Sequence, residues 1–118
     1  MKQVYLSIVI PAYNESKNIK KNILEVDRWV KRNNKYPFEI IVINDGSTDD
    51  TKSILNKIKS SSKNLKVIHH DTNFGRGKAI RTGFENALGK YIICLDADLS
   101  YAPKHISILL QQAIKEGI

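Results

Sequence analysis

The feature that most constrains the fold is an alternation, repeated four times, between a short apolar run and a segment with helical spacing of apolar residues. The runs are residues 4–10, 38–43, 65–69 and 91–95. Runs that are apolar at successive positions are typical of strands covered on both faces. The alternation therefore predicts an α/β fold, in which a doubly wound, mostly parallel sheet carries helices on both faces.

Local signals indicate where these elements end. Pro11 is expected to stop the first strand, and Ser47 and Asp50 have the spacing of a capping box for the second helix. Gly89 is expected to end the third helix in the left-handed conformation. Pro103 is expected to open a fourth helix.

The strand order decides which loops meet. In the commonest doubly wound arrangement the order is 3-2-1-4, so the first and fourth strands are neighbours and the chain reverses direction between them. Ligands bind at the carboxyl ends of the strands beside such a switch point. This order places residues 11–15 next to residues 96–98.

Composition limits the chain to one ordinary domain. It has 118 residues, 42% of them hydrophobic, and its apolar stretches of five to seven residues are far shorter than the ~20 of a membrane-spanning helix. The N-terminus lacks a small-residue cleavage site and reads as a strand rather than a signal peptide. Cys94 is the single cysteine, which excludes an intrachain disulfide and fits a reducing compartment. We therefore predict a cytoplasmic protein.

The net charge of +7 does not identify a partner by itself. A basic surface attracts nucleic acid, anionic lipid headgroups or phosphorylated substrates alike. The lysines are spread through the predicted helices rather than gathered in one run, which is typical of a solvated surface. No nucleic acid partner is predicted.

Asp96 and Asp98 follow the fourth apolar run directly. Residues two apart in extended chain point to the same side, so both carboxylates are aimed at one place. Hard oxygen ligands of this kind suit Mg²⁺ or Mn²⁺, ions that also bridge to phosphate oxygens. The alternative is that Asp96 ends a strand and Asp98 caps a turn.

Two further loops carry groups that suit a nucleotide. Asp45, after the second run, can accept hydrogen bonds from a nucleobase or ribose, although Asp, Gly and Ser are also the usual residues of a turn. Tyr13 can stack on a base while Glu15 meets a polar edge, although loop tyrosines are often half-buried packing residues.

The segment from Gly75 to Lys78, with Arg81 one turn later, indicates an anion site at a helix N-terminus. Its spacing is not that of a Walker loop, and no Gly-x-Gly-x-x-Gly follows the first strand. NAD or FAD binding is therefore not expected. The three histidines, His69, His70 and His105, are assigned no role because they lack partners at metal-ligand spacing.

Together these segments resemble family 2 glycosyltransferases with the GT-A fold. The resemblance rests on three stretches in order, residues 7–15, 42–49 and 96–98. A narrower similarity, to the branch that transfers mannose or glucose to dolichyl or other polyprenyl phosphates, rests on residues 73–83, residues 96–100 and Pro103. Asn44 departs from the family, which more usually has Asp there.

The resemblance implies a donor site for a UDP- or GDP-linked sugar and inverting transfer of a hexose. It implies that the base and ribose are lined by Pro11, Ala12, Tyr13 and Glu15. Asp45 would contact the base, and Lys78 and Arg81 would lie toward the base or diphosphate. Asp96 would reach the ribose or the metal, and Asp98 would bind the metal, Mg²⁺ or Mn²⁺. The acceptor would be a polyprenyl phosphate at the cytoplasmic membrane face.

Family members continue past residue 118 into acceptor-binding elements, so the resemblance implies that residues 1–118 are a nucleotide-sugar-binding domain truncated before that part. The catalytic base is then expected outside this chain. An uncovered sheet edge makes a homodimer an expectation.

Two other functions compete with transfer. One is a non-catalytic nucleotide-binding or assembly module left by truncation. The other is a phosphotransfer signalling domain, which would need acidic residues after the first strand and an Asp directly after the third. The chain has Tyr13-Asn14-Glu15 and His69-His70-Asp71 there, which disfavours it.

Overall fold

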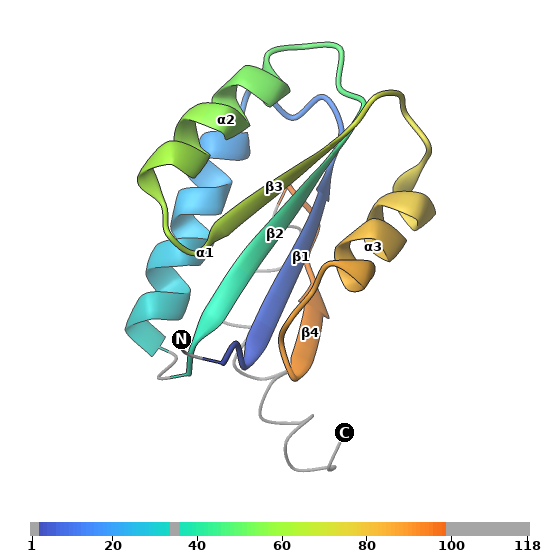
Figure 1. Ribbon diagram of the computed structural model, residues 1–118. Coiled ribbons are helices and arrows are strands. Elements are labelled where there is room, and N and C mark those ends of the chain that lie inside the picture. Colours follow the sequence, from blue (N-terminus) through green and yellow to red (C-terminus); the bar gives the residue numbers. More distant parts are fainter. Residues whose placement is uncertain (1–2, 34–35, 99–118) are drawn as a thin grey trace.

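The computed structural model describes residues 3–33 and 36–98 (Figure 1). Along these residues the elements are β1 (Leu6–Ala12), α1 (Ile19–Asn33), β2 (Phe38–Asp45), α2 (Thr51–Ser61), β3 (Leu65–His70), α3 (Arg76–Glu85) and β4 (Tyr91–Cys94). The predicted alternation of strands and helices is confirmed. The helix predicted to begin at Pro103 lies outside the described residues.

The four strands form one parallel sheet in the order β3-β2-β1-β4, as predicted. β1 pairs with β2 on one side and with β4 on the other. The carboxyl ends of all four strands therefore lie at one edge of the sheet, and β1 and β4 meet there at the switch point.

The prediction that Pro11 ends the first strand is wrong. β1 continues to Ala12, which is in register with Asn44 of β2. The reason lies on the other side of the strand, where Val9 O accepts from Leu95 N at 2.9 Å. Residues two apart face the same side, so the N–H that Pro11 lacks would point toward β4, beyond the last paired residue of that strand.

Helices cover both faces of the sheet: α1 and α2 lie on one face and α3 lies on the other (Figure 1). Successive residues of β1 alternate between them, because Ile8 and Ile10 belong to the larger core under α1 and α2 whereas Val9 belongs to the core under α3. α3 packs closely on the sheet, since a Cβ on Gly83 would lie 2.3 Å from Val9 Cγ1. None of the helices in residues 3–33 and 36–98 has the length and apolar character needed to cross a membrane.

A buried carboxylate lies at the amino end of the sheet, on the α3 face. Glu39 Oε2 accepts from Ser7 Oγ at 2.6 Å and from Leu88 N at 2.7 Å, and Lys66 Nζ lies 2.7 Å from Oε1. Burial alone would raise the pKa of Glu39, but the hydrogen bonds from Leu88, Lys66 and Ser7 outweigh it and lower that pKa. The Glu39 carboxylate thus links β1, β3 and the connection between α3 and β4.

The prediction for Gly89 is also wrong. α3 ends at Glu85, and Gly89 does not have a positive φ. Gly89 is needed for close approach instead, because its N–H donates to Ser7 Oγ at 2.8 Å and a Cβ would lie 2.6 Å from Ser7 N.

Candidate functional site

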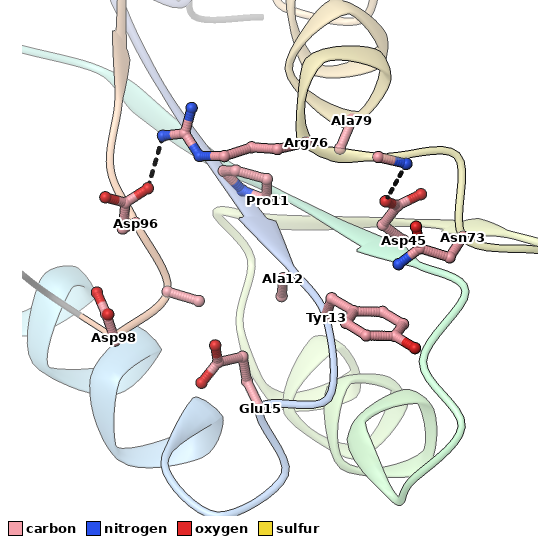
Figure 2. Close-up of a pocket in the computed structure, with 12 residues that line it drawn as sticks. Pro11, Ala12, Tyr13, Glu15, Asp45, Asn73, Arg76, Ala79, Asp96 and Asp98 are labelled. Carbon is pink, nitrogen blue, oxygen red and sulfur yellow. Dashed lines mark hydrogen bonds and ion pairs between the residues drawn. The ribbon is translucent and has the colours of Figure 1, made fainter.

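A pocket of about 340 Å³ opens at the carboxyl ends of the strands, beside the switch point between β1 and β4 (Figure 2). Its walls come from the carboxyl ends of β1 and β2, from the loops after β1, β3 and β4, and from the start of α3. The lining residues are Pro11, Ala12, Tyr13, Glu15, Asp45, Asn73, Gly75, Arg76, Ala79, Asp96, Ala97 and Asp98. The strand order thus brings residues 11–15 and 96–98 to one cavity, as the sequence predicted.

Hydrogen bonds join the loop after β1 to the β2–α2 loop and to the first residue of α2, and they position Tyr13 and Glu15. Asn14, whose φ is 51°, donates its N–H to Ser47 Oγ at 2.9 Å, and Glu15 N donates to Thr51 Oγ1 at 3.0 Å. The capping box predicted for the second helix is wrong, because Ser47 is engaged by Asn14 and Asp50 makes no side-chain cap to the helix that begins at Thr51.

Asp45 is the most buried acidic group of the pocket, and it is only 3% exposed. Oδ1 accepts from His70 Nδ1 at 2.8 Å and from Phe74 N at 3.0 Å, while Oδ2 accepts from Gly75 N at 2.9 Å. Burial raises the pKa of Asp45, but these hydrogen bonds outweigh it, so the pKa lies below its ordinary value of 3.8. Asp45 is therefore an ionised acceptor that also holds the β3–α3 loop.

Two glycines make this contact between loops sterically feasible. Gly46 has φ of 69°, and a Cβ there would lie 2.2 Å from the carbonyl carbon of Thr72. Gly75 has φ of 99°, a conformation in which its N–H meets Asp45. Side chains at either position would separate the two loops or strain the backbone.

Negative charge gathers on the side of the pocket away from Asp45. The side chains of Glu15 and Asp98 both line that side (Figure 2). Burial, followed by the charges of Asp98 and Asp49, raises the pKa of Glu15 above its ordinary value of 4.5. Carboxylates that repel one another in this way are stabilised by a cation.

Arg76, the first residue of α3, reaches across the pocket to Asp96, and Nη2 lies 2.6 Å from Oδ1 (Figure 2). The pair is solvated, since the Arg76 side chain is 60% exposed. Such pairs contribute about 1 kcal/mol or less. Both groups are therefore readily available to a ligand that offers negative charge to Arg76.

The carboxylate oxygens in the pocket suit a hard divalent cation, but they do not complete its coordination without a bound ligand. In the described part of the chain no three His, Cys, Asp or Glu side chains are grouped so as to hold a metal ion. Asp96 and Asp98 both line the pocket. Mg²⁺ is commonly held by one or two carboxylates together with substrate phosphates, so these two residues fit a site that a diphosphate would complete.

The structure brings together most of the predicted site residues and adds others. Lys78 and Arg81 are not among the residues that line the pocket. Arg76 is the basic residue of this segment that lines the pocket, and the sequence signal was present, because Arg76 lies in the same glycine-rich segment and directly after the loop. His70 was missed because only the pairing of β2 with β3 places it beside Asp45.

Comparisons with known proteins agree on one family. Residues 7–118 match the sequence profile of glycosyl transferase family 2. The chain is 41% identical over 115 residues to CsbB of Bacillus subtilis (strain 168), covering 98% of this chain and 33% of that protein. It is 35% identical over 99 residues to dolichyl-phosphate beta-glucosyltransferase ALG5A of Trichomonas vaginalis, covering 80% and 31%. The chain spans about a third of the length of these curated relatives.

Solved structures show the same fold. TarS of S. aureus, in complex with UDP-GlcNAc, superposes with a TM-score of 0.74 at 26% identity, covering 95% of this chain and 32% of TarS. The mannosyltransferase PcManGT of Pyrobaculum calidifontis, in complex with GDP-Man and Mn²⁺, superposes with a TM-score of 0.68 at 23% identity, covering 79% and 27%. The architecture is therefore that of GT-A glycosyltransferases.

Proposed function

The chain belongs to glycosyl transferase family 2, and on that premise we propose that its pocket binds a nucleoside diphosphate sugar for transfer of the hexose to an acceptor. One observation carries the proposal. Tyr13, Asp45, Arg76, Asp96 and Asp98, which can meet a base, a diphosphate and a cation in turn, line a single cavity at the switch point. TarS, a related structure, holds UDP-GlcNAc.

The base lies between Tyr13 and Asp45. The Tyr13 ring is about half exposed beside the pocket and offers a stacking face. Hydrogen bonds hold the Asp45 carboxylate ionised, so it can accept a hydrogen bond but cannot donate one. It therefore pairs with the ring N–H of uracil or guanine, whereas cytosine and adenine present an unprotonated ring nitrogen at that position. This chemistry favours a UDP- or GDP-linked donor.

The diphosphate lies between Arg76 and the acid pair. Arg76 is the first residue of α3, so its guanidinium and the free N–H groups of the helix start offer positive charge at the same place. Asp96 and Asp98 would hold Mg²⁺ or Mn²⁺. Such an ion supplies Lewis-acid stabilisation of the charge that develops on the departing diphosphate.

Transfer forms a bond between the anomeric carbon and an acceptor oxygen and breaks the bond from that carbon to the diphosphate oxygen, with inversion. We propose a polyprenyl phosphate as the acceptor at a membrane surface. The name of the relative ALG5A, a dolichyl-phosphate glucosyltransferase, supports this class. A phosphate acceptor is already anionic, so it needs little deprotonation. Residues 1–118 would form the donor-binding part of this reaction.

Calorimetric titration of the chain with UDP-glucose and GDP-mannose, each with Mn²⁺, tests the proposal. We expect one of them to bind at submillimolar concentration and CDP to bind at least tenfold more weakly. Asp98→Ala should weaken binding with Mn²⁺ present but change it little with EDTA. Absence of binding of either donor at millimolar concentration would contradict the proposal. Hydrolysis or transfer of the bound donor separates an enzyme from a binding module.

A further inference from the structure

His70 occupies a position in the site that the proposed donor contacts leave unexplained. It is the last residue of β3, in register with Asp45, the last residue of β2. Its side chain is 10% exposed and both ring nitrogens have partners: Nδ1 lies 2.8 Å from Asp45 Oδ1, and Nε2 lies 2.9 Å from Thr82 Oγ1 in α3. The ring therefore joins two strands to a helix through polar contacts.

The chemistry of the partners decides the role of Nδ1. Asp45 is an ionised carboxylate and can only accept, so Nδ1 of His70 carries a proton and donates it. The Phe74 ring packs edge-on against the imidazole, with centroids 5.3 Å apart at 74°. On the far side, Thr82 Oγ1 donates to Lys78 O at 3.0 Å, which connects the ring to the first turn of α3.

This network leads directly to the wall of the pocket. The carboxylate that His70 holds is the same one that accepts the N–H groups of Phe74 and Gly75. Asn73, Gly75 and Arg76, which flank or make these contacts, all line the cavity. A carboxylate that rotates away from His70 would release the loop and move Arg76 with it.

We propose that His70 is a positioning residue for donor binding: its Nδ1–H fixes the Asp45 carboxylate, and the fixed carboxylate holds the β3–α3 loop and the start of α3 against the nucleotide. The inference rests on the proposed nucleotide-sugar site and deepens it. His70 need not touch the donor, because the pocket-lining residues do not include it.

The neighbouring histidine provides a matched control. His69 points to the other face of the sheet, where Nδ1 lies 2.9 Å from Asn44 Nδ2 and Nε2 lies 2.9 Å from Asn56 Oδ1 of α2. Burial, together with the charges of Lys52 and Lys59, lowers the pKa of His69. His69 thus joins the same two strands to a helix without contacting the β3–α3 loop.

The test compares UDP affinity, with Mn²⁺, in the wild-type chain and in His70→Leu, His70→Gln, His70→Asn and His69→Leu. Asparagine places an amide N–H near the position of Nδ1, whereas glutamine reaches the position of Nε2. We expect His70→Leu and His70→Gln to raise the Kd for UDP about tenfold. His70→Asn should stay within about threefold of wild type, and so should His69→Leu. Equal affinity of His70→Leu and wild type, or equal losses in both leucine variants, would overturn the proposal.

Amide hydrogen exchange without ligand keeps the two proposals separate. If His70 positions the loop, His70→Leu speeds exchange of the Phe74 and Gly75 amides while His69→Leu leaves them unchanged. Failure of the wild-type chain to bind either UDP or GDP would count against the nucleotide-sugar site alone. Unchanged exchange of the two amides in His70→Leu would overturn the positioning role whether or not UDP binds.

Discussion

Glu39 and Asp45 lie on the same face of β2, at opposite ends of the strand, and Asp45 lines the pocket at the switch point. Both are buried, both accept backbone and side-chain hydrogen bonds, and both have lowered pKa values. The partners of Glu39 come from elements that pack at the amino end, whereas those of Asp45 come from a loop that lines the cavity. The same chemistry therefore stabilises the fold at one end and shapes the wall of a pocket at the other.

The difference follows from the parallel sheet. At the amino end the α3–β4 connection passes close over β1, as the contact between Gly89 and Ser7 shows, and Glu39 is covered. At the carboxyl end the loop after β1 leads to α1 on one face of the sheet and the loop after β3 leads to α3 on the other face (Figure 1), so a cavity opens between them. Substitutions at the two carboxylates should thus separate stability from binding.

Replacing Glu39 with alanine should have the largest effect. The change removes the acceptor of the Ser7 hydroxyl and the Leu88 N–H, and each unsatisfied buried donor costs about 1–3 kcal/mol. We expect the free energy of unfolding, measured by urea denaturation, to fall by about 3 kcal/mol. Lys66→Ala removes a partner that is 44% exposed and should cost about 1 kcal/mol. If Glu39→Ala lowers the free energy of unfolding no more than Lys66→Ala does, the buried Glu39 carboxylate does not have the stabilising role that distinguishes it from Asp45.

Replacing Asp45 with asparagine should act mainly on binding. The amide presents an N–H where the carboxylate accepts from His70, Phe74 or Gly75, so the loop loses at least one hydrogen bond and the base loses its anionic acceptor. We expect UDP affinity to fall about thirtyfold, or about 2 kcal/mol. Glu39→Gln, assayed at a temperature where it stays folded, should bind UDP as wild type does. Equal affinities in the two variants would contradict the comparison.

Protonation of Glu39 and Asp45 at low pH should lower the free energy of unfolding. The decrease should be smaller than that caused by removing either side chain, because the oxygen atoms stay in place. Their pKa values are lower in the folded than in the unfolded chain, so their contribution is present above the ordinary values of 4.5 and 3.8 and is lost as pH falls below them. The free energy of unfolding should decrease from about pH 5 downward, and the slope should flatten in Glu39→Gln. A slope that Glu39→Gln leaves unaltered would show that Glu39 does not contribute.

Replacing Glu15 with glutamine should have the smallest effect on stability and the opposite sign. Burial and the charges of Asp98 and Asp49 raise the pKa of Glu15, so its ionised form opposes folding at neutral pH. We expect a gain of about 0.5 kcal/mol at pH 7, since the group is partly solvated. The gain should vanish as pH is lowered and Glu15 takes up its proton. A stability loss at pH 7 would show that Glu15 makes a favourable contact instead.

The sequence predicted the sheet and most of the pocket because both depend on patterns that lie within short stretches of the chain. Continuous apolar runs identified each strand, and the strand order placed residues 11–15 beside Asp96 and Asp98. Pro11 was misread as a strand end because its effect depends on where β4 stops pairing. Gly89 was misread because its role is set by the approach of Ser7, which is 82 residues away in sequence.

The parts of the site that escaped prediction depend on contacts between distant segments. His70 gained a role only when the register of β2 and β3 was known. Arg76, Lys78 and Arg81 are equivalent in sequence as cations near a helix start, and the direction of the first turn of α3 selects Arg76. Ser47 could equally have capped the second helix, and the loop conformation at Asn14 decides against it.

The most direct test is a titration of the ¹⁵N-labelled chain with UDP and with GDP, each in the presence of Mg²⁺, followed residue by residue by the amide chemical shifts. If the carboxyl ends of the strands form the donor site, the largest shifts fall on Tyr13, Gly46, Gly75 and Arg76, whereas the amides of Leu88 and Gly89 beside Glu39 stay in place. Shifts concentrated at Leu88 and Gly89, or none anywhere with either UDP or GDP at millimolar concentration, would contradict the assignment of the site.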